Sequence, residues 1–148
     1  MQSAKKENEQ KKQYLNGYRR HVQRIRRIEA EIEEIRQMKL YPSEGNDGMP
    51  RGSSQGDLSD FAAKLTEKEE ELYREGVEQV KIYRDIDWKI SQLENENERD
   101  VLFYRYIKAK SWWEIAELMS FSERQIYRIH GQALAHFQLS QKDVSECQ

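Results

Sequence analysis

The sequence predicts an all-α protein: a long antiparallel helical hairpin, similar to a coiled coil, followed by a C-terminal helix-turn-helix unit. Apolar residues recur at steps of three and four along two long segments, which places them on one stripe of a helix. A connector rich in Gly and Pro separates these segments, and two helix-capping patterns lie close together near the C-terminus. No strand-like alternation extends beyond four residues.

Residues 1–40 are predicted to form the first long helix. Its apolar stripe consists of Leu15, Tyr18, Val22, Ile25, Ile28, Ile32, Ile35 and Met38. The segment has eleven basic and six acidic residues, hence a net charge of +5. One basic cluster could hold nucleic-acid phosphates, although in a helix that faces an acidic partner we prefer to interpret it as a paired or solvated face. This cluster comprises Arg19, Arg20, His21, Arg24, Arg26 and Arg27.

Residues 41–57 are predicted to be a flexible linker, because both prolines and four of the seven glycines lie there. Residues 58–97 are predicted to form the second long helix. Its apolar stripe consists of Leu58, Phe61, Leu65, Leu72, Val80, Tyr83, Ile86, Ile90 and Leu93. Residues 61–98 have six basic and eleven acidic residues, hence a net charge of −5. The two helices therefore carry opposite charge.

Each apolar stripe is too narrow to form a core alone, so each long helix needs a partner. The linker allows the second helix to fold back antiparallel on the first, and the opposite charges favour that pairing. Exposed ion pairs contribute only about 0.2 to 1 kcal/mol each, so burial supplies most of the energy. Self-association of two copies through the same stripes is the alternative, and homodimerisation is kept as a hypothesis.

Residues 98–138 are predicted to form the helix-turn-helix. Ser111 with Glu114, and Ser122 with Gln125, both fit the capping box that begins a helix. Only Met119, Ser120 and Phe121 separate the two helices, which must therefore cross at a steep angle. Residues 139–148 are assigned to a tail.

A steep crossing needs a small residue where the helices touch, and Ala116 fits that position. The residues expected to pack inside are Ile115, Ala116, Leu118, Phe121, Ile126 and Ile129. The outer face of the second helix is then expected to present Glu123, Arg124, Gln125, Tyr127, Arg128 and His130. An exposed, capped helix with such side chains is a candidate recognition helix for the major groove.

Arg can donate two hydrogen bonds to guanine and Gln can pair with adenine, whereas Tyr127 and the lysines are suited to phosphates. We expect the recognition helix to extend over about residues 122–138. The candidate DNA-binding residues are Ser122, Glu123, Arg124, Gln125, Tyr127, Arg128, Lys108 and Lys110.

This part of the chain resembles region 4 of bacterial sigma factors, which reads the −35 promoter element. About forty of the 148 residues carry the resemblance. They include Glu98, Arg99, Val101, Leu102, Arg105, Tyr106, Ile107, Ser111, Trp112, Glu114, Ile115, Ala116, Glu117, Phe121, Ser122, the run from Arg124 to His130, Ala133 and Leu134. The N-terminal two thirds have no counterpart of sigma region 2, which argues against a working sigma factor.

Long helices before such a unit resemble the phage and prophage transcriptional regulators of the RinA/ArpU type, which act on late or packaging genes. The resemblance implies DNA contacts at Ser122, Glu123, Arg124, Gln125 and Arg128. The turn position that usually holds Gly is Ser120, which must accept or avoid a left-handed backbone.

These observations predict a cytoplasmic, sequence-specific regulator of transcription that binds double-stranded DNA, with RNA polymerase as a candidate second partner. Two alternatives stay open: the small terminase subunit of phage DNA packaging, and a coiled-coil adaptor that binds protein rather than DNA. A single Cys excludes a disulfide framework, and no apolar run is long enough to span a membrane. No catalytic, metal-binding or cofactor-binding pattern is present, so we expect no enzyme activity, metal or cofactor.

Overall fold

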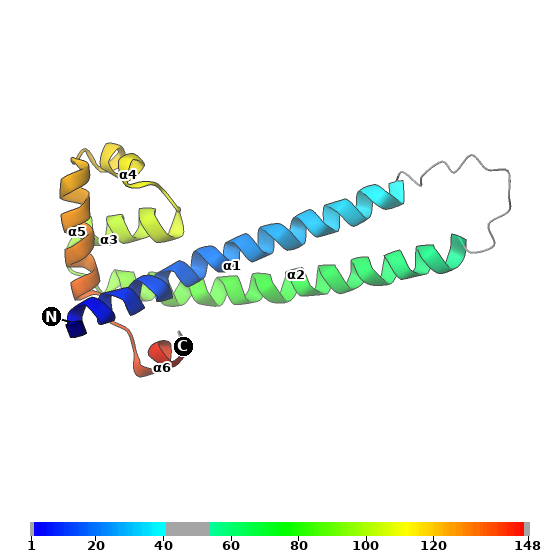
Figure 1. Cartoon of the computed structure of the whole chain (residues 1–148), viewed down its shortest axis with the longest axis horizontal. Coiled ribbons are helices and arrows are strands. Elements are labelled where there is room, and N and C mark those ends of the chain that lie inside the picture. The colour runs from blue at the N-terminus through cyan, green and yellow to red at the C-terminus, as the bar shows by residue number, and fades with distance from the viewer. Residues whose placement is uncertain (1, 41–53, 147–148) are drawn as a thin grey trace. The chain divides into compact units, whose positions relative to one another are not determined.

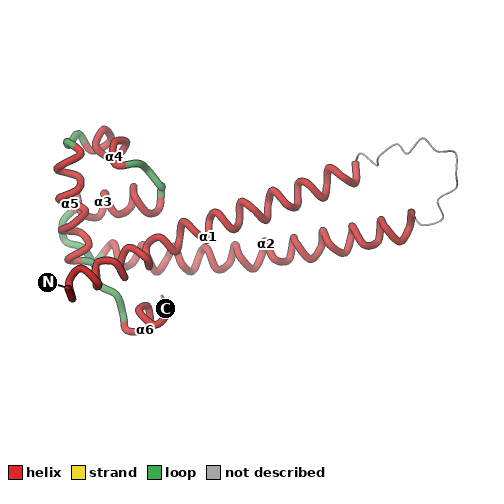
Figure 2. The backbone as a smooth tube through the Cα atoms, viewed as in Figure 1, coloured by secondary structure: helices red, strands yellow, loops and turns green. Residues whose placement is uncertain are grey.

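The computed structural model describes residues 2–40 and 54–146, and in these residues all regular structure is helical (Figures 1 and 2). The all-α prediction is therefore confirmed. The helices are α1 (Gln2–Leu40), α2 (Ser54–Ser91), α3 (Glu96–Leu102), a π-helical segment η1 (Phe103–Ile107), α4 (Trp112–Met119), α5 (Glu123–His136) and α6 (Gln141–Glu146).

The second long helix begins and ends earlier than predicted. It starts at Ser54, within the predicted linker, and the other linker residues, 41–53, lie outside the described residues. It stops at Ser91 rather than at residue 97, because the last part of the predicted segment belongs to a separate helix, α3, which is capped by Asn95. The Asn95 side chain accepts a hydrogen bond from the Glu98 backbone N–H at 3.2 Å, which caps α3.

The chain forms two compact units that divide it differently from the predicted domains. We call residues 22–78 the hairpin unit and residues 2–21 with 79–146 the terminal unit. Both long helices contribute to both units. The helix-turn-helix therefore shares its unit with the first turns of α1 and the last turns of α2, and no domain boundary falls at residue 98.

In the hairpin unit, α1 and α2 pair within one chain, as predicted. Ile25, Ile28, Ile32 and Ile35 are buried along α1. Ion pairs join the two helices at Arg24–Glu75 (3.7 Å), Glu31–Lys68 (2.9 Å) and Arg36–Glu69 (2.9 Å). Arg24 pairs with Glu75, whereas the later α1 residues Glu31 and Arg36 pair with the earlier α2 residues 68 and 69, so the helices are antiparallel.

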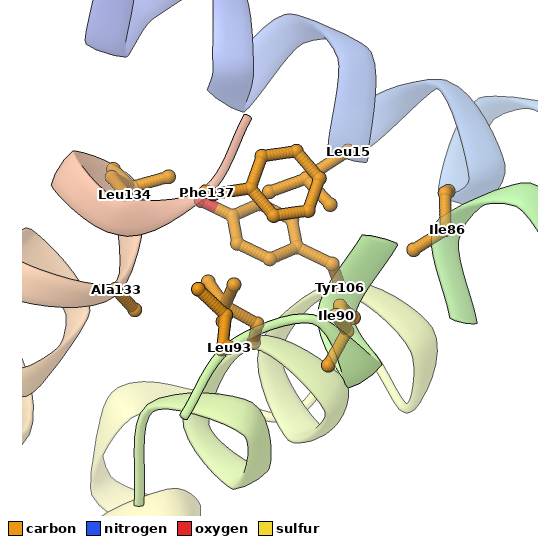
Figure 3. Packing of buried hydrophobic residues seen from close by; sticks show 9 residues of the cluster. Leu15, Ile86, Ile90, Leu93, Tyr106, Ala133, Leu134 and Phe137 are labelled. Atoms are coloured by element: carbon orange, nitrogen blue, oxygen red, sulfur yellow. The ribbon is translucent and has the colours of Figure 1, made fainter. Parts of the chain in front are cut away.

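The terminal unit has two apolar clusters. The larger one joins the ends of the long helices to the helix-turn-helix and consists of Leu15, Ile86, Ile90, Leu93, Leu102, Tyr106, Ala133, Leu134 and Phe137. Figure 3 shows Leu15 of α1 beside the rings of Tyr106 and Phe137. Phe137, directly after α5, is fully buried and packs 6.2 Å from the ring of Tyr14 in α1. The end of α5 is therefore anchored on the long helices.

The smaller cluster joins α3, α4 and α5 through Val101, Ile115, Ala116, Ile126 and Ile129. The predicted inward positions of Ile115, Ala116, Ile126 and Ile129 are confirmed, and Phe121 packs partly buried against them. The prediction for Leu118 is wrong, since it is 56% exposed. Met119, four residues after Ile115 rather than three, takes the inner position instead.

The predicted tail contains a helix, α6, that was not expected from the sequence. Ser140 and Asp143 form reciprocal hydrogen bonds at its start, with Ser140 N–H to Asp143 Oδ2 at 2.8 Å and Asp143 N–H to Ser140 Oγ at 3.3 Å. Asp143 also pairs with Lys89 of α2 at 3.3 Å. The spacing of Ser140 and Asp143 is that of a capping box, so a signal for this helix is present in the sequence.

The shared core predicts that a change in α1 will loosen α5. Leu15→Ala should lower the free energy of unfolding by about 2 to 5 kcal/mol, because it leaves a cavity in the larger cluster. Hydrogen exchange of backbone amides should then accelerate in α5. Ile28→Ala, equally buried but in the hairpin unit, is the matched control and should accelerate exchange within residues 22–78. Unchanged exchange of α5 in Leu15→Ala would contradict the shared core.

Candidate nucleic-acid interface

Both helices of the helix-turn-helix begin with the predicted capping box. In α4, Ser111 Oγ accepts from the Glu114 backbone N–H at 3.2 Å, and Glu114 Oε2 accepts from the Ser111 N–H at 2.8 Å. These hydrogen bonds from Ser111 hold the pKa of the Glu114 carboxyl below its usual value. In α5, Ser122 and Gln125 repeat the arrangement at 3.2 and 2.8 Å. The first turn of α5 is thereby fixed.

The turn between α4 and α5 uses the left-handed backbone that a glycine would adopt most easily. Ser120 has φ 58° and ψ 39°. Its own N–H and that of Phe121 both bond to carbonyls in the last turn of α4, with Phe121 N–H to Ala116 O at 3.0 Å. The left-handed conformation costs a non-glycine residue about 1 to 2 kcal/mol, which the packed helices on each side must offset.

The capping box engages two of the predicted DNA-binding residues. Gln125 Oε1 accepts hydrogen bonds from the N–H and the hydroxyl of Ser122. Adenine recognition by Gln needs its amide oxygen and nitrogen together, so Gln125 cannot read a base in this way without breaking the cap. Ser122 likewise uses both its hydroxyl and its N–H at the helix start. Gln125 and Ser122 therefore position α5 and are weak candidates for base contacts.

The other predicted residues of α5 are exposed. Arg124 and Arg128, one helical turn apart, extend from the same side of the helix, and Glu123 lies at its first turn. Tyr127 is half exposed because its ring packs 5.0 Å from the ring of Trp112 at the start of α4. The side of α5 opposite Ile126 and Ile129 thus presents two guanidinium groups and one phenol.

Lys108 and Lys110 lie in the loop between η1 and α4. Lys108 is exposed and Lys110 is partly buried. The Arg105 side chain donates to the Lys110 carbonyl at 3.0 Å and lies 4.3 Å from the Trp112 ring centroid. Because Trp112 also contacts Tyr127, this chain of contacts connects the loop to one edge of α5.

The prediction that His130 lies on the outer face is wrong, since it is 8% exposed. It lies four residues after Ile126, on the same side of the helix, and so points inward. Its Nε2 is 2.8 Å from the hydroxyl of Tyr106, and its ring centroid lies 4.7 Å from that of Trp112, with the two ring planes at 70°. Burial lowers the pKa of His130 to about 4, with Lys12 and Arg105 adding to the effect. Burial also raises the pKa of Tyr106 to about 12, so Tyr106 keeps its proton and donates to the neutral imidazole.

One structural residue of this interface was not predicted from the sequence. Lys11 of α1 is 4% exposed, and its Nζ donates to the Leu134 carbonyl in the last turn of α5 at 2.8 Å. It also pairs with Glu7 at 3.2 Å. A cation is favourable at the negative end of a helix dipole. The sequence holds a signal for this role, because Lys11 lies four residues before Leu15 and so shares the apolar side of α1.

Within the described residues, no group of three or more His, Cys, Asp or Glu side chains could hold a metal ion. Nor is any helix in that part of the chain both long and apolar enough to cross a membrane.

These observations define the class of the protein: in the residues described it is all-helical, and its terminal unit contains a capped helix-turn-helix. The sequence profile of a family described as "protein of unknown function (DUF1492)" matches residues 42–138, and the chain belongs to this family. The matched range includes α2 to α5. No curated protein and no solved structure matches the chain.

The buried histidine predicts acid-sensitive stability. Because the pKa of His130 falls from 6.5 in the unfolded chain to about 4 in the folded one, the unfolded state binds more protons between these values. The stability that His130 contributes in its neutral form is fully present above pH 6.5 and is lost as the pH falls towards 4. Between pH 7 and pH 5 the free energy of unfolding should decrease by about 2 kcal/mol from this group.

Denaturant titrations at the two pH values measure this decrease. His130→Gln should remove most of it, because a glutamine can still accept from Tyr106 but does not titrate. The matched control, His136→Gln, changes the exposed histidine of the same helix and should retain the decrease. An equal decrease in wild type and His130→Gln would assign the pH dependence to other groups.

Proposed function

We propose that this protein is a sequence-specific regulator of transcription that binds double-stranded DNA, with α5 as its recognition helix in the major groove. The observation that carries the proposal is the rotational setting of α5. Ile126 and Ile129 are buried, whereas Arg124 and Arg128 extend into solvent from the opposite side. An α-helix fits the major groove, and Arg is the side chain best suited to guanine.

The resemblance to sigma region 4 and to phage regulators of the RinA/ArpU type supports this proposal from the sequence. It places DNA contacts on the first turns of the same helix. The capping box that fixes Gln125 changes the expected roles: Arg124 and Arg128 become the base-reading candidates, and Tyr127, Lys108 and Lys110 the phosphate-binding ones. A helix-turn-helix usually needs a second half-site for useful specificity, so a homodimer belongs to the proposal.

Selection of duplexes from a random-sequence pool by the full chain tests the proposal, since such a pool contains the binding site whatever its sequence. We expect one motif to be enriched. Arg128→Ala should weaken binding to the selected duplex by about 1 to 3 kcal/mol and change binding to random duplexes far less. Gln125→Ala, which removes a cap, should weaken both in similar proportion.

The matched control is Lys142→Ala, which removes an exposed cation from α6 and should leave the preference intact. Absence of any enriched motif, together with no affinity for duplex DNA at physiological salt, would overturn the proposal in favour of the protein-binding adaptor. Assembly of the free protein into ring-sized oligomers would instead favour the small terminase subunit.

A further inference from the structure

The first turns of α1 extend past the core of the terminal unit. Every side chain from residue 2 to residue 7 is exposed, and the first buried side chain of the helix is Lys11. Helices in proteins gain most of their stability by packing an apolar face, and these turns have none. Their exposed surface is polar and includes Lys5 and Lys6.

Three cations of α1 share one side of the helix. Lys5, Lys12 and Arg19 are seven residues apart, and a seven-residue step returns to nearly the same side with a drift of about 20°. At 1.5 Å per residue, the three Cα atoms span about 21 Å along the helix axis. We call these residues the basic stripe. Lys5 and Arg19 are exposed, and the Lys12 side chain is 41% exposed.

The middle of the basic stripe lies near the C-terminal end of α5. Figure 1 shows the start of α1 next to the C-terminal end of α5, and the Lys11–Leu134 hydrogen bond joins the two helices there. Lys12, the next residue, is close enough to His130 of α5 to contribute to its low pKa. The middle of the basic stripe is therefore adjacent to the proposed recognition helix, within one compact unit.

Two carboxylates lie along the same turns of α1: Glu7 pairs with Lys11, outside the basic stripe, and Glu9 pairs with a member of the stripe. Glu9 pairs with Lys12 at 3.7 Å, and both side chains are substantially exposed. Such a surface pair is worth about 1 kcal/mol or less, so a phosphate could replace the carboxylate at small cost. Protein interfaces usually centre on buried aromatic or large apolar anchors. The basic stripe and its neighbour Asn16 contain no aromatic or large apolar side chain that could serve as such an anchor. A polyanion therefore fits this surface better than a protein partner does.

We infer that Lys5, Lys12 and Arg19 bind the phosphate backbone of the same duplex that α5 reads. This inference rests on the proposed function and adds a second contact surface, on α1. Lysine and arginine contacts to phosphates set the position of a protein on the duplex and release condensed counterions. The basic stripe would thus raise affinity for duplex DNA of any sequence, while Arg124 and Arg128 would provide the sequence preference.

The test measures affinity of the full chain for a fluorescent random-sequence duplex over a series of salt concentrations. The triple variant Lys5→Ala, Lys12→Ala and Arg19→Ala should make the slope of log affinity against log salt shallower by about 0.9 for each phosphate that is no longer neutralised. The matched control, Lys6→Ala, Arg20→Ala and Lys142→Ala, removes the same charge from neighbouring positions and from α6, and should alter the slope little. Glu9→Gln should strengthen binding, because it removes the carboxylate beside Lys12.

The outcomes separate this inference from the proposed function. If the wild type binds duplex DNA but the salt slope is the same for both triple variants, the proposed role of the basic stripe is refuted. The proposal that α5 is the recognition helix is unaffected by that result. Failure of the wild type to bind any duplex would overturn both. Circular dichroism of each variant checks that α1 stays helical. If only an acidic polypeptide, and not DNA, binds the wild type and loses affinity in the triple variant, the partner is a protein and the inference is wrong.

Discussion

The rotation of α5 about its own axis is the constraint on which the candidate interface depends, because it decides which side chains of α5 are exposed to solvent. Three sets of contacts fix it. Ile126 and Ile129 enter the smaller apolar cluster, the Ser122–Gln125 capping box fixes the first turn, and Phe137 anchors the end in the larger cluster. Because these contacts fix the rotation of α5, the side chains of Arg124 and Arg128 lie on its solvent-facing side.

The larger cluster explains why long helices accompany so small a helix-turn-helix. A unit of about forty residues is near the lower size limit for a domain that is stable without additional support. Leu15 from α1, together with Ile86 and Ile90 from α2, supplies part of the missing core. Lys11 adds a hydrogen bond to the last turn of α5. The start of α1 and the end of α2 are therefore part of the structure that positions α5, the proposed recognition helix.

Local patterns in the sequence were sufficient for the two long helices and for the caps of α4 and α5, since a capping box depends on residues three apart and an apolar stripe on steps of three and four. Tertiary packing could not be read in this way. The spacing of His130 from Ile126 places it on the inner side of α5, but its partners there, Tyr106 of η1 and Trp112 of α4, are brought to it by tertiary packing. The division into units depends on Leu15 meeting Phe137 across most of the chain, and no local pattern records that contact.

We propose that the solvent-facing side of α5 contacts duplex DNA. The most direct measurement is an NMR titration of the isotope-labelled full chain with the selected duplex, in which changes of backbone amide shifts are mapped onto the residues. We expect the largest shift changes in α5 around Arg124 to Arg128, with smaller ones at the start of α1. Changes confined to residues 22–78, with α5 unaffected at saturation, would contradict it.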